Sequence, residues 1–142
     1  MQKGLLRRVP LLMGVATLAS TVSFSAAAQQ VTDTYLIRQD SSDCNNSNVN
    51  ANNPSLIGGS MWVVRQTNGG TTAKVAITAS PDTTYNLFHK CVGQIGGITT
   101  GDEGVGVGVF TFQTSPGILT FDMYPNGAPA GNKFQSVPIT VQ

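Results

Sequence analysis

The chain has 142 residues, of which only 11% are charged and 16 are glycine, and its formal net charge is +1. This length is enough for one small domain. The 8 basic residues are scattered and nearly balanced by 7 acidic ones, which excludes the usual nucleic-acid-binding modules with their clustered basic surfaces.

The first 28 residues predict a secretory signal peptide. Basic side chains at Lys3, Arg7 and Arg8 precede an apolar stretch from Val9 to Leu18, and small residues end the segment at Ala28. This three-part layout is typical of a removable leader. The alternative is an N-terminal membrane anchor, but the apolar stretch is shorter than the ~20 residues that a spanning helix needs. We expect a secreted or periplasmic protein without a membrane span in its mature part.

The mature part, residues 29–142, is expected to form one domain. It keeps five basic and seven acidic residues, a formal net charge of −2, which argues against phosphate-rich or anionic membrane partners. It also contains both cysteines of the chain, Cys44 and Cys91. In an exported chain this count predicts one disulfide, and closing a loop of roughly 48 residues stabilises the fold by about 4 kcal/mol. The alternative is two thiols, one of them catalytic.

Short apolar runs separated by Gly, Pro, Asn and Asp predict an all-β domain, and no window shows the spacing of an amphipathic helix. Seven short strands in about a hundred residues are typical of an antiparallel two-sheet sandwich. The expected strands cover Thr32 to Arg38, Ser60 to Gln66, Thr72 to Ala79, Thr84 to Val92, Val105 to Gln113, Ile118 to Tyr124 and Phe134 to Val141.

Two of these strands carry detailed expectations. Ala73, Val75 and Ile77 alternate with polar or small residues, so one face of the third strand is expected to be buried. The strand before it joins it through Asn68-Gly69-Gly70, which favours a hairpin. In the last strand Pro138 lacks a backbone donor, which predicts a sheet edge or a bulge.

Two loops are candidate binding sites, because loops at the end of a sandwich often bind ligands. The first, from Asp43 to Asn53, contains six asparagines and is expected to be tethered to the fourth strand by the disulfide. The second runs from Pro125 to Asn132. The candidate binding residues are Asn45, Asn46, Asn48, Asn50, Asn126 and Asn132.

The acidic and amide side chains in and before the first loop are candidate metal ligands. Asp40, Asp43 and the neighbouring asparagines offer oxygen ligands that suit calcium. The segment lacks the glycine and the closing glutamate of an EF-hand loop, and no zinc or other transition-metal spacing is present. We predict no metal and no cofactor.

The segment Pro81-Asp82-Thr83-Thr84-Tyr85 leads directly into a predicted strand. It resembles the corner of fibronectin type III and related immunoglobulin-like domains, where a tyrosine side chain bonds back to the backbone. Residues 81–124 as a whole resemble a group of small exported bacterial proteins without assigned function. The resemblance implies an immunoglobulin-like sandwich and an exported location, and it implies no activity.

Catalysis has few candidate residues. His89 is the only histidine, and it lies in phase with Tyr85, Leu87 and Cys91, so packing explains it better than proton transfer. The adjacent carboxylates Asp102 and Glu103 are expected at a solvated turn. Glycosidase chemistry needs two carboxylates that face each other, which the sequence does not indicate. We therefore predict that the protein is not an enzyme.

The run from Gly104 to Val109 puts glycine on one strand face and valine on the other. One interpretation is that Trp62 covers the bare glycine face from a neighbouring strand. Another is pairing between chains, since the segment has high β-propensity, no charge and no proline. Val105, Val107 and Val109 form the candidate assembly edge.

The sequence thus predicts an exported, non-catalytic module for binding or cell-surface interaction, with a glycan, peptide or protein as ligand. Two alternatives are a self-assembling surface fibre or matrix subunit, and an enzyme of unrecognised type.

Overall fold

The computed structural model describes residues 29–40, 43–127 and 132–142, and the predicted signal peptide lies outside them. The described chain is all-β, as predicted, with one short 3-10 helix, η1. The elements are β1 (Val31–Ile37), η1 (Pro54–Leu56), β2 (Ile57–Arg65), β3 (Gly70–Thr78), β4 (Thr84–His89), β5 (Gly93–Thr99), β6 (Val105–Gln113), β7 (Gly117–Leu119), β8 (Phe121–Pro125), β9 (Phe134–Ser136) and β10 (Ile139–Val141).

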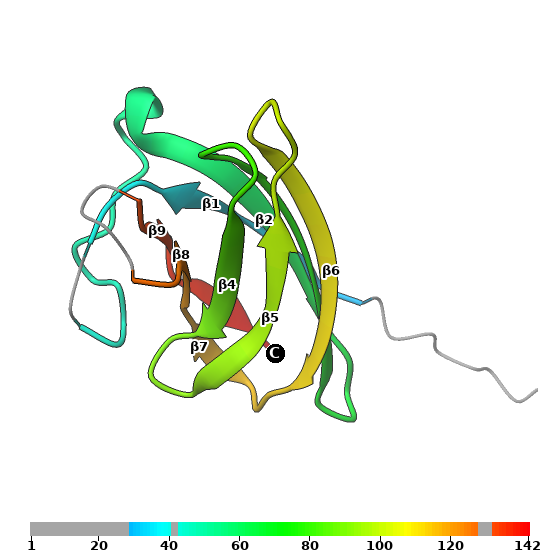
Figure 1. Cartoon of the computed structure of the whole chain (residues 1–142). Coiled ribbons are helices and arrows are strands. Elements are labelled where there is room, and N and C mark those ends of the chain that lie inside the picture. The colour runs from blue at the N-terminus through cyan, green and yellow to red at the C-terminus, as the bar shows by residue number, and fades with distance from the viewer. Residues whose placement is uncertain (1–28, 41–42, 128–131) are drawn as a thin grey trace, which may run out of the picture.

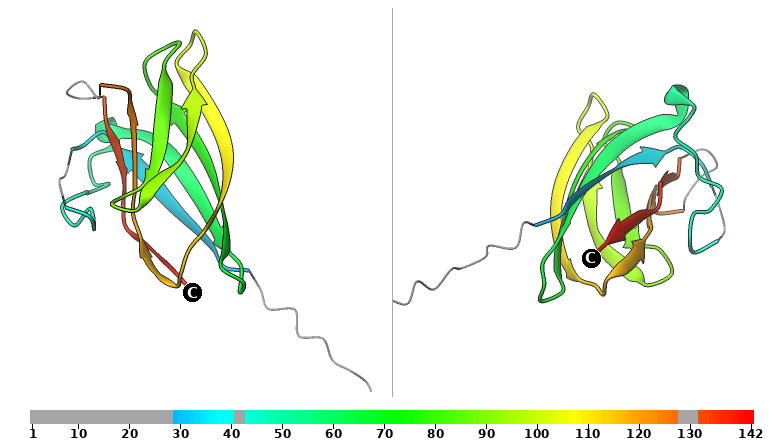
Figure 2. Two further views of the ribbon diagram at one scale, coloured as in Figure 1. Left: turned by 60° about the horizontal axis from the view of Figure 1, so that its bottom comes forward. Right: turned by 180° about the vertical axis from the view of Figure 1, so that it is seen from behind.

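Eight of these strands form one sheet in the order β5-β4-β8-β9-β1-β2-β3-β6, and β10 pairs with β7 in a second, two-stranded sheet. All paired strands are antiparallel. The large sheet curls so far that its end strands, β5 and β6, lie side by side (Figures 1 and 2). The structure therefore has an eight-stranded, nearly closed sheet where the sequence predicted seven strands in two sheets.

The difference in strand number arises at three places. The strand predicted to reach Val92 ends at His89, because Cys91 adopts a positive φ of 59° in a turn. β5 follows that turn and was missed, since its three glycines hide the alternation of a strand. The last two predicted strands are each divided, at Thr120 and before Pro138.

Other predictions about the strands are confirmed. Ala73, Val75 and Ile77 on β3 are buried, and Lys74 and Thr78 are exposed. β2 and β3 form the expected hairpin, in which Gly69 has a positive φ of 85°. The core gathers inward-facing side chains from both sheets: Leu36, Met61, Val63, Ala73, Val75, Ile77, Tyr85, Leu87, Ile98, Leu119, Phe121, Met123, Phe134, Ile139 and Val141.

Glycines explain how β5 and β6 approach each other closely without pairing. A Cβ atom at Gly106 would lie 2.5 Å from Cγ2 of Ile98, and one at Gly96 would lie 2.5 Å from the ring of Phe110. Each end strand thus leaves space for a side chain of the other. The interpretation that Trp62 covers the glycine face is wrong, because Ile98 and Phe110 cover it and Trp62 lies on the opposite, outer face.

Candidate functional site

The predicted disulfide is present and joins the asparagine-rich loop to the turn after β4. The Sγ atoms of Cys44 and Cys91 are 2.07 Å apart. Thr120 strengthens this attachment, since its hydroxyl donates to the carbonyl oxygen of Cys44 at 2.6 Å. The loop is therefore fixed to the body of the domain by both covalent and polar contacts.

Asn46, a candidate binding residue, is fully buried inside this attachment. Its Nδ2 donates to the carbonyl oxygens of Phe121 and Ser136, at 3.3 Å and 3.0 Å, and its Oδ1 accepts from Nζ of Lys90 at 2.6 Å. The amide therefore satisfies backbone groups at the edges of β8 and β9. This role is structural, and sequence composition alone did not reveal it.

A carboxylate completes this buried polar cluster. Nζ of Lys90 lies 3.6 Å from Oδ1 of Asp122, which also accepts from Nε2 of Gln135 at 3.2 Å. Burial raises the pKa of Asp122, and the charge of Lys90 opposes that rise by favouring the carboxylate. The Lys90 ammonium and the Asp122 carboxylate thus compensate each other at low exposure, which is how proteins accommodate buried charge.

The remaining asparagines lie at or near the surface. Asn45, Asn48 and Asn50 are exposed. In the second loop, Asn126 accepts from Nδ2 of Asn86 at 3.0 Å, and Asn132 accepts from the hydroxyl of Tyr85. Residues 128–131 of that loop lie outside the described part of the chain.

The oxygen ligands considered for calcium are engaged elsewhere. Asp43 accepts from the backbone N–H and the hydroxyl of Ser47, and Asp40 forms an ion pair of 2.8 Å with Lys133. Within the described ranges, no group of three or more His, Cys, Asp or Glu side chains is arranged to hold a metal ion.

The candidate catalytic residues do not converge. Burial lowers the pKa of His89, whose ring packs 5.8 Å from that of Phe121 and 6.3 Å from that of Phe112. Its ring nitrogens have no hydrogen-bond partner in the described part of the chain. Asp102 and Glu103 are exposed in the turn between β5 and β6.

An aromatic surface that the sequence reasoning did not identify lies on the outer face of β1 and β2. The register pairs Tyr35 with Ser60 and Asp33 with Trp62. The two aromatic side chains therefore share one face as diagonal neighbours, for which a separation of about 7–8 Å is typical. Tyr35 is 51% exposed and Trp62 38%. The sequence did contain one signal for this surface, because the strand around Trp62 is apolar on both faces. Which side chain of β1 lies beside Trp62, however, depends on the register between the two strands.

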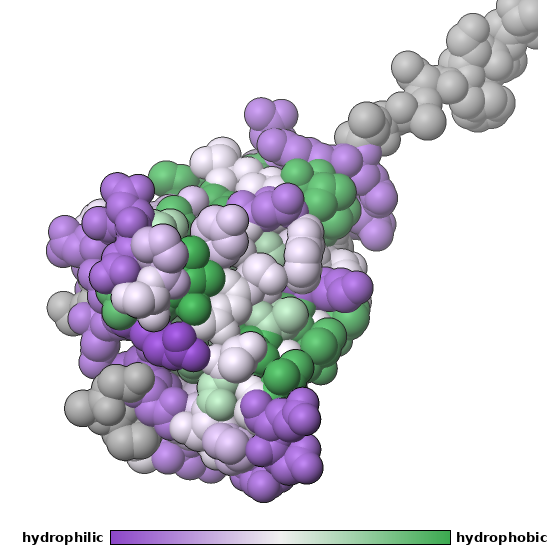
Figure 3. Space-filling model, turned by 90° about the horizontal axis from the view of Figure 1, so that it is seen from above, coloured by the Kyte–Doolittle hydropathy of each residue, from purple (hydrophilic) through white to green (hydrophobic). Residues whose placement is uncertain are grey.

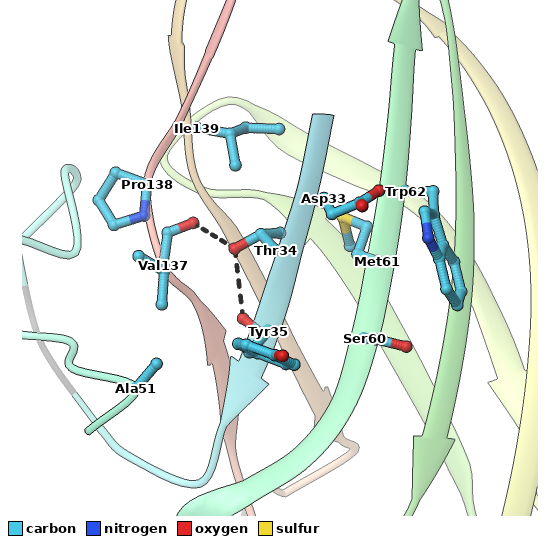
Figure 4. A pocket seen from close by; sticks show the side chains of 10 residues that line it. All are labelled: Asp33, Thr34, Tyr35, Ala51, Ser60, Met61, Trp62, Val137, Pro138 and Ile139. Atoms are coloured by element: carbon cyan, nitrogen blue, oxygen red, sulfur yellow. Dashed lines mark hydrogen bonds between the residues drawn. The ribbon is translucent and has the colours of Figure 1, made fainter. Parts of the chain in front are cut away.

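A hollow of about 340 Å³ opens beside these aromatic residues, along the edge of β1 that faces away from β2, and its opposite wall is formed by Ala51, Val137, Pro138 and Ile139. Figure 4 shows Asp33 and Tyr35 on β1 facing the same side as Trp62, while Thr34 points the other way and donates to the carbonyl oxygen of Val137. A second hollow of about 410 Å³ begins on the other side of Tyr35 and reaches Val105. The two hollows share Tyr35 and Ser60.

The polar groups of this face are available to a ligand. The carboxylate of Asp33, the hydroxyls of Tyr35 and Ser60, and the indole N–H of Trp62 make no hydrogen bond with any described residue. Such a combination of aromatic surface and a few unpartnered polar groups is typical of small-ligand sites.

The valines of the predicted assembly edge lie on the same outer face. All three valines of β6 are exposed. Their partners on the neighbouring strand β3 are Thr78 for Val105, Ala76 for Val107 and Lys74 for Val109. Hydrophobic side chains reach the surface in several places among hydrophilic ones (Figure 3). The outer face is therefore partly apolar over β1, β2, β3 and β6.

Comparison with protein-family models, with curated proteins and with solved structures finds no match. In the described part of the chain, no helix is long and apolar enough to cross a membrane.

Proposed function

We propose that this protein is an exported, non-catalytic binding module that recognises its ligand on the outer face of β1 and β2. The observation that carries this proposal is the hollow of about 340 Å³ beside Tyr35 and Trp62, with its unpartnered polar groups. Exposed aromatic side chains next to a cavity are costly to leave in water and favourable to cover with a ligand.

The predicted leader and the disulfide support a secreted or periplasmic location, because disulfides persist in oxidising compartments. The proposed kinship with fibronectin type III and immunoglobulin-like domains is supported by one local contact: the hydroxyl of Tyr85 accepts from the backbone N–H of Ser80 at 3.1 Å. Non-catalytic function is supported by the packing of His89 among aromatic rings.

Binding is tested by placing a long charged side chain at the floor of the outer face. Ser60→Arg is expected to abolish binding of fluorescently labelled protein to cell envelopes of the organism that exports it, because the side chain fills the hollow. Thr140→Arg, at an exposed position on β10, is the matched control and should bind like the wild type. Equal binding by Ser60→Arg would refute the outer face as the site.

A second candidate function is self-assembly through β6, the end strand of the large sheet. The carbonyl oxygen of Gly104 accepts from the N–H of Ala79, the residue after β3, so the backbone groups of Val107 and Val109 point toward the other edge of β6. The carbonyl oxygen of Val105 points the same way but already accepts from the N–H of Gly101. The sequence from Val105 to Val109 reads the same in both directions. If β6 strands of two chains paired antiparallel around Val107, each valine would therefore lie opposite a valine and each glycine opposite a glycine. Pairing there displaces β5, so the aromatic site is favoured.

Self-assembly is tested by light scattering after size-exclusion chromatography. Val107→Lys should convert an assembling protein to a folded monomer, whereas Val92→Lys, an exposed valine in a turn, should not. A monomeric wild-type protein, or continued assembly of Val107→Lys, contradicts this second function.

A further inference from the structure

We propose that the hollow between Tyr35 and Trp62 binds a neutral oligosaccharide, with a pyranose ring against the aromatic side chains and its hydroxyls bonded to Asp33 and Ser60. This inference rests on the proposed function, because it names the ligand class of the same outer face.

The outer face beside Tyr35 and Trp62 matches the chemistry of a sugar ring. A pyranose has apolar C–H faces and a rim of hydroxyls, and the negatively charged faces of aromatic rings attract polarised hydrogens. Tyr35 and Trp62 provide two such rings as diagonal neighbours on adjacent strands. Asp33 lies opposite Trp62 and Ser60 opposite Tyr35, so each ring has a hydrogen-bonding group beside it (Figure 4).

The polar groups of this face favour a sugar over a protein partner. A tight protein interface would remove water from the Asp33 carboxylate, and burying it without partners is costly. Sugar hydroxyls can donate hydrogen bonds to a carboxylate, and they can both donate to and accept from the hydroxyls of Ser60 and Tyr35. Each of these groups therefore keeps a hydrogen-bond partner when a sugar covers it. A volume of about 340 Å³ lies in the size range of small-ligand sites.

The charge at the hollow favours a neutral sugar. Asp33 lines the hollow. Lys74 on β3 pairs with Trp62 on β2, but Lys74 does not line the hollow. A sugar carboxylate would therefore meet Asp33 directly, where like charges repel. A neutral glycan avoids this repulsion, so we expect neutral glycans to bind more tightly than uronic-acid or sialic-acid glycans.

The second hollow offers space for a ligand longer than one sugar unit. This hollow, of about 410 Å³, starts at Tyr35 and passes the small side chains of Ser60 and Ala76. Because small side chains leave room above the sheet, a chain of sugar units has a path from Trp62 past Tyr35 toward Val105. We therefore expect an oligosaccharide to bind more tightly than its monosaccharide.

The test is an array of neutral and acidic oligosaccharides, followed by calorimetric titration of residues 29–142 with the strongest neutral ligand. Trp62→Ala should weaken binding at least about tenfold, which is about 1.4 kcal/mol. Asp33→Asn should weaken the neutral ligand and improve relative binding of acidic ones. Ile118→Ala, which truncates an exposed side chain on β7, is the matched control and should bind normally. Thermal melting of each variant checks that it folds.

Two results overturn the glycan inference: no neutral glycan binds, or Trp62→Ala binds as tightly as the wild type. The envelope assay separates this failure from that of the proposed function. If Ser60→Arg still loses envelope binding while no glycan binds, the outer face recognises another ligand class. If Ser60→Arg keeps envelope binding, the outer face is not the binding site and both proposals fail.

Discussion

Replacing Gly104 with alanine should destabilise the fold far more than replacing Gly101, although both glycines lie in the turn between β5 and β6. Gly104 has a positive φ of 76°, and an added Cβ atom would collide with the carbonyl oxygen of Ala79. Its own carbonyl oxygen accepts from the N–H of Ala79 at 2.8 Å, so the backbone cannot move away without losing this bond. At Gly101 the nearest atom to an added Cβ is the carbonyl oxygen of Val105, 4.0 Å away.

The size of the effect follows from two costs. A left-handed backbone costs alanine about 1–2 kcal/mol relative to glycine, and a forced shift of well-packed neighbours costs about 1–3 kcal/mol. Gly104→Ala should therefore lower the free energy of unfolding by about 2–5 kcal/mol. For a domain of this size, a loss of 2 kcal/mol lowers the melting temperature by roughly 8 °C.

Urea unfolding followed by circular dichroism is the appropriate assay. Gly101→Ala should stay within about 0.5 kcal/mol of the wild type, as expected for an unstrained surface position. A Gly104→Ala protein as stable as Gly101→Ala would refute the reasoning, because it would show that the turn relaxes at no cost.

Three further predictions concern the attached loop and the aromatic cluster. The double variant Cys44→Ser, Cys91→Ser should unfold with about 4 kcal/mol less stability in urea, and an unchanged midpoint would contradict the entropic role of the disulfide. Asn46→Ala leaves two backbone carbonyls and Lys90 without its amide and should cost about 1–3 kcal/mol or more, whereas the exposed Asn48→Ala should be neutral in thermal melts. Burial lowers the pKa of His89 below its usual 6.5, so the unfolded chain binds the proton more tightly and stability should fall as the pH drops from about 7 to about 5. His89→Phe should reduce this fall in stability, and an identical pH dependence of both proteins would exclude His89 as its source.

The β class of the domain was readable from local pattern. Alternation in β3 identified its buried face, and the apolar-glycine run identified β6 as a strand with one bare face. The strand β5 was not readable, because glycines at positions 93, 96 and 97 remove the side chains that mark alternation. Glycines of β5 and β6 leave space for side chains of the opposite end strand, and this role is visible only when the two strands lie side by side.

The candidate binding residues show the same limit. From composition, all the asparagines of the loop after Asp43 were equally good candidate binding residues. In the structure Asn46 is buried, whereas Asn45, Asn48 and Asn50 are exposed. What distinguishes Asn46 is its contact with Phe121, Ser136 and Lys90, which are 75, 90 and 44 residues away in the chain. No property of the loop itself contains that information.

By itself, the sequence determined an all-β chain with one disulfide, because alternation and cysteine count depend on near neighbours and on compartment. Only the tertiary structure decided that the sheet curls until β5 meets β6, and that Tyr35 lies diagonally across from Trp62. The physical reason is register: a shift of one residue between β1 and β2 would turn Tyr35 toward the core, and the pairing that prevents this shift is set by contacts over the whole sheet.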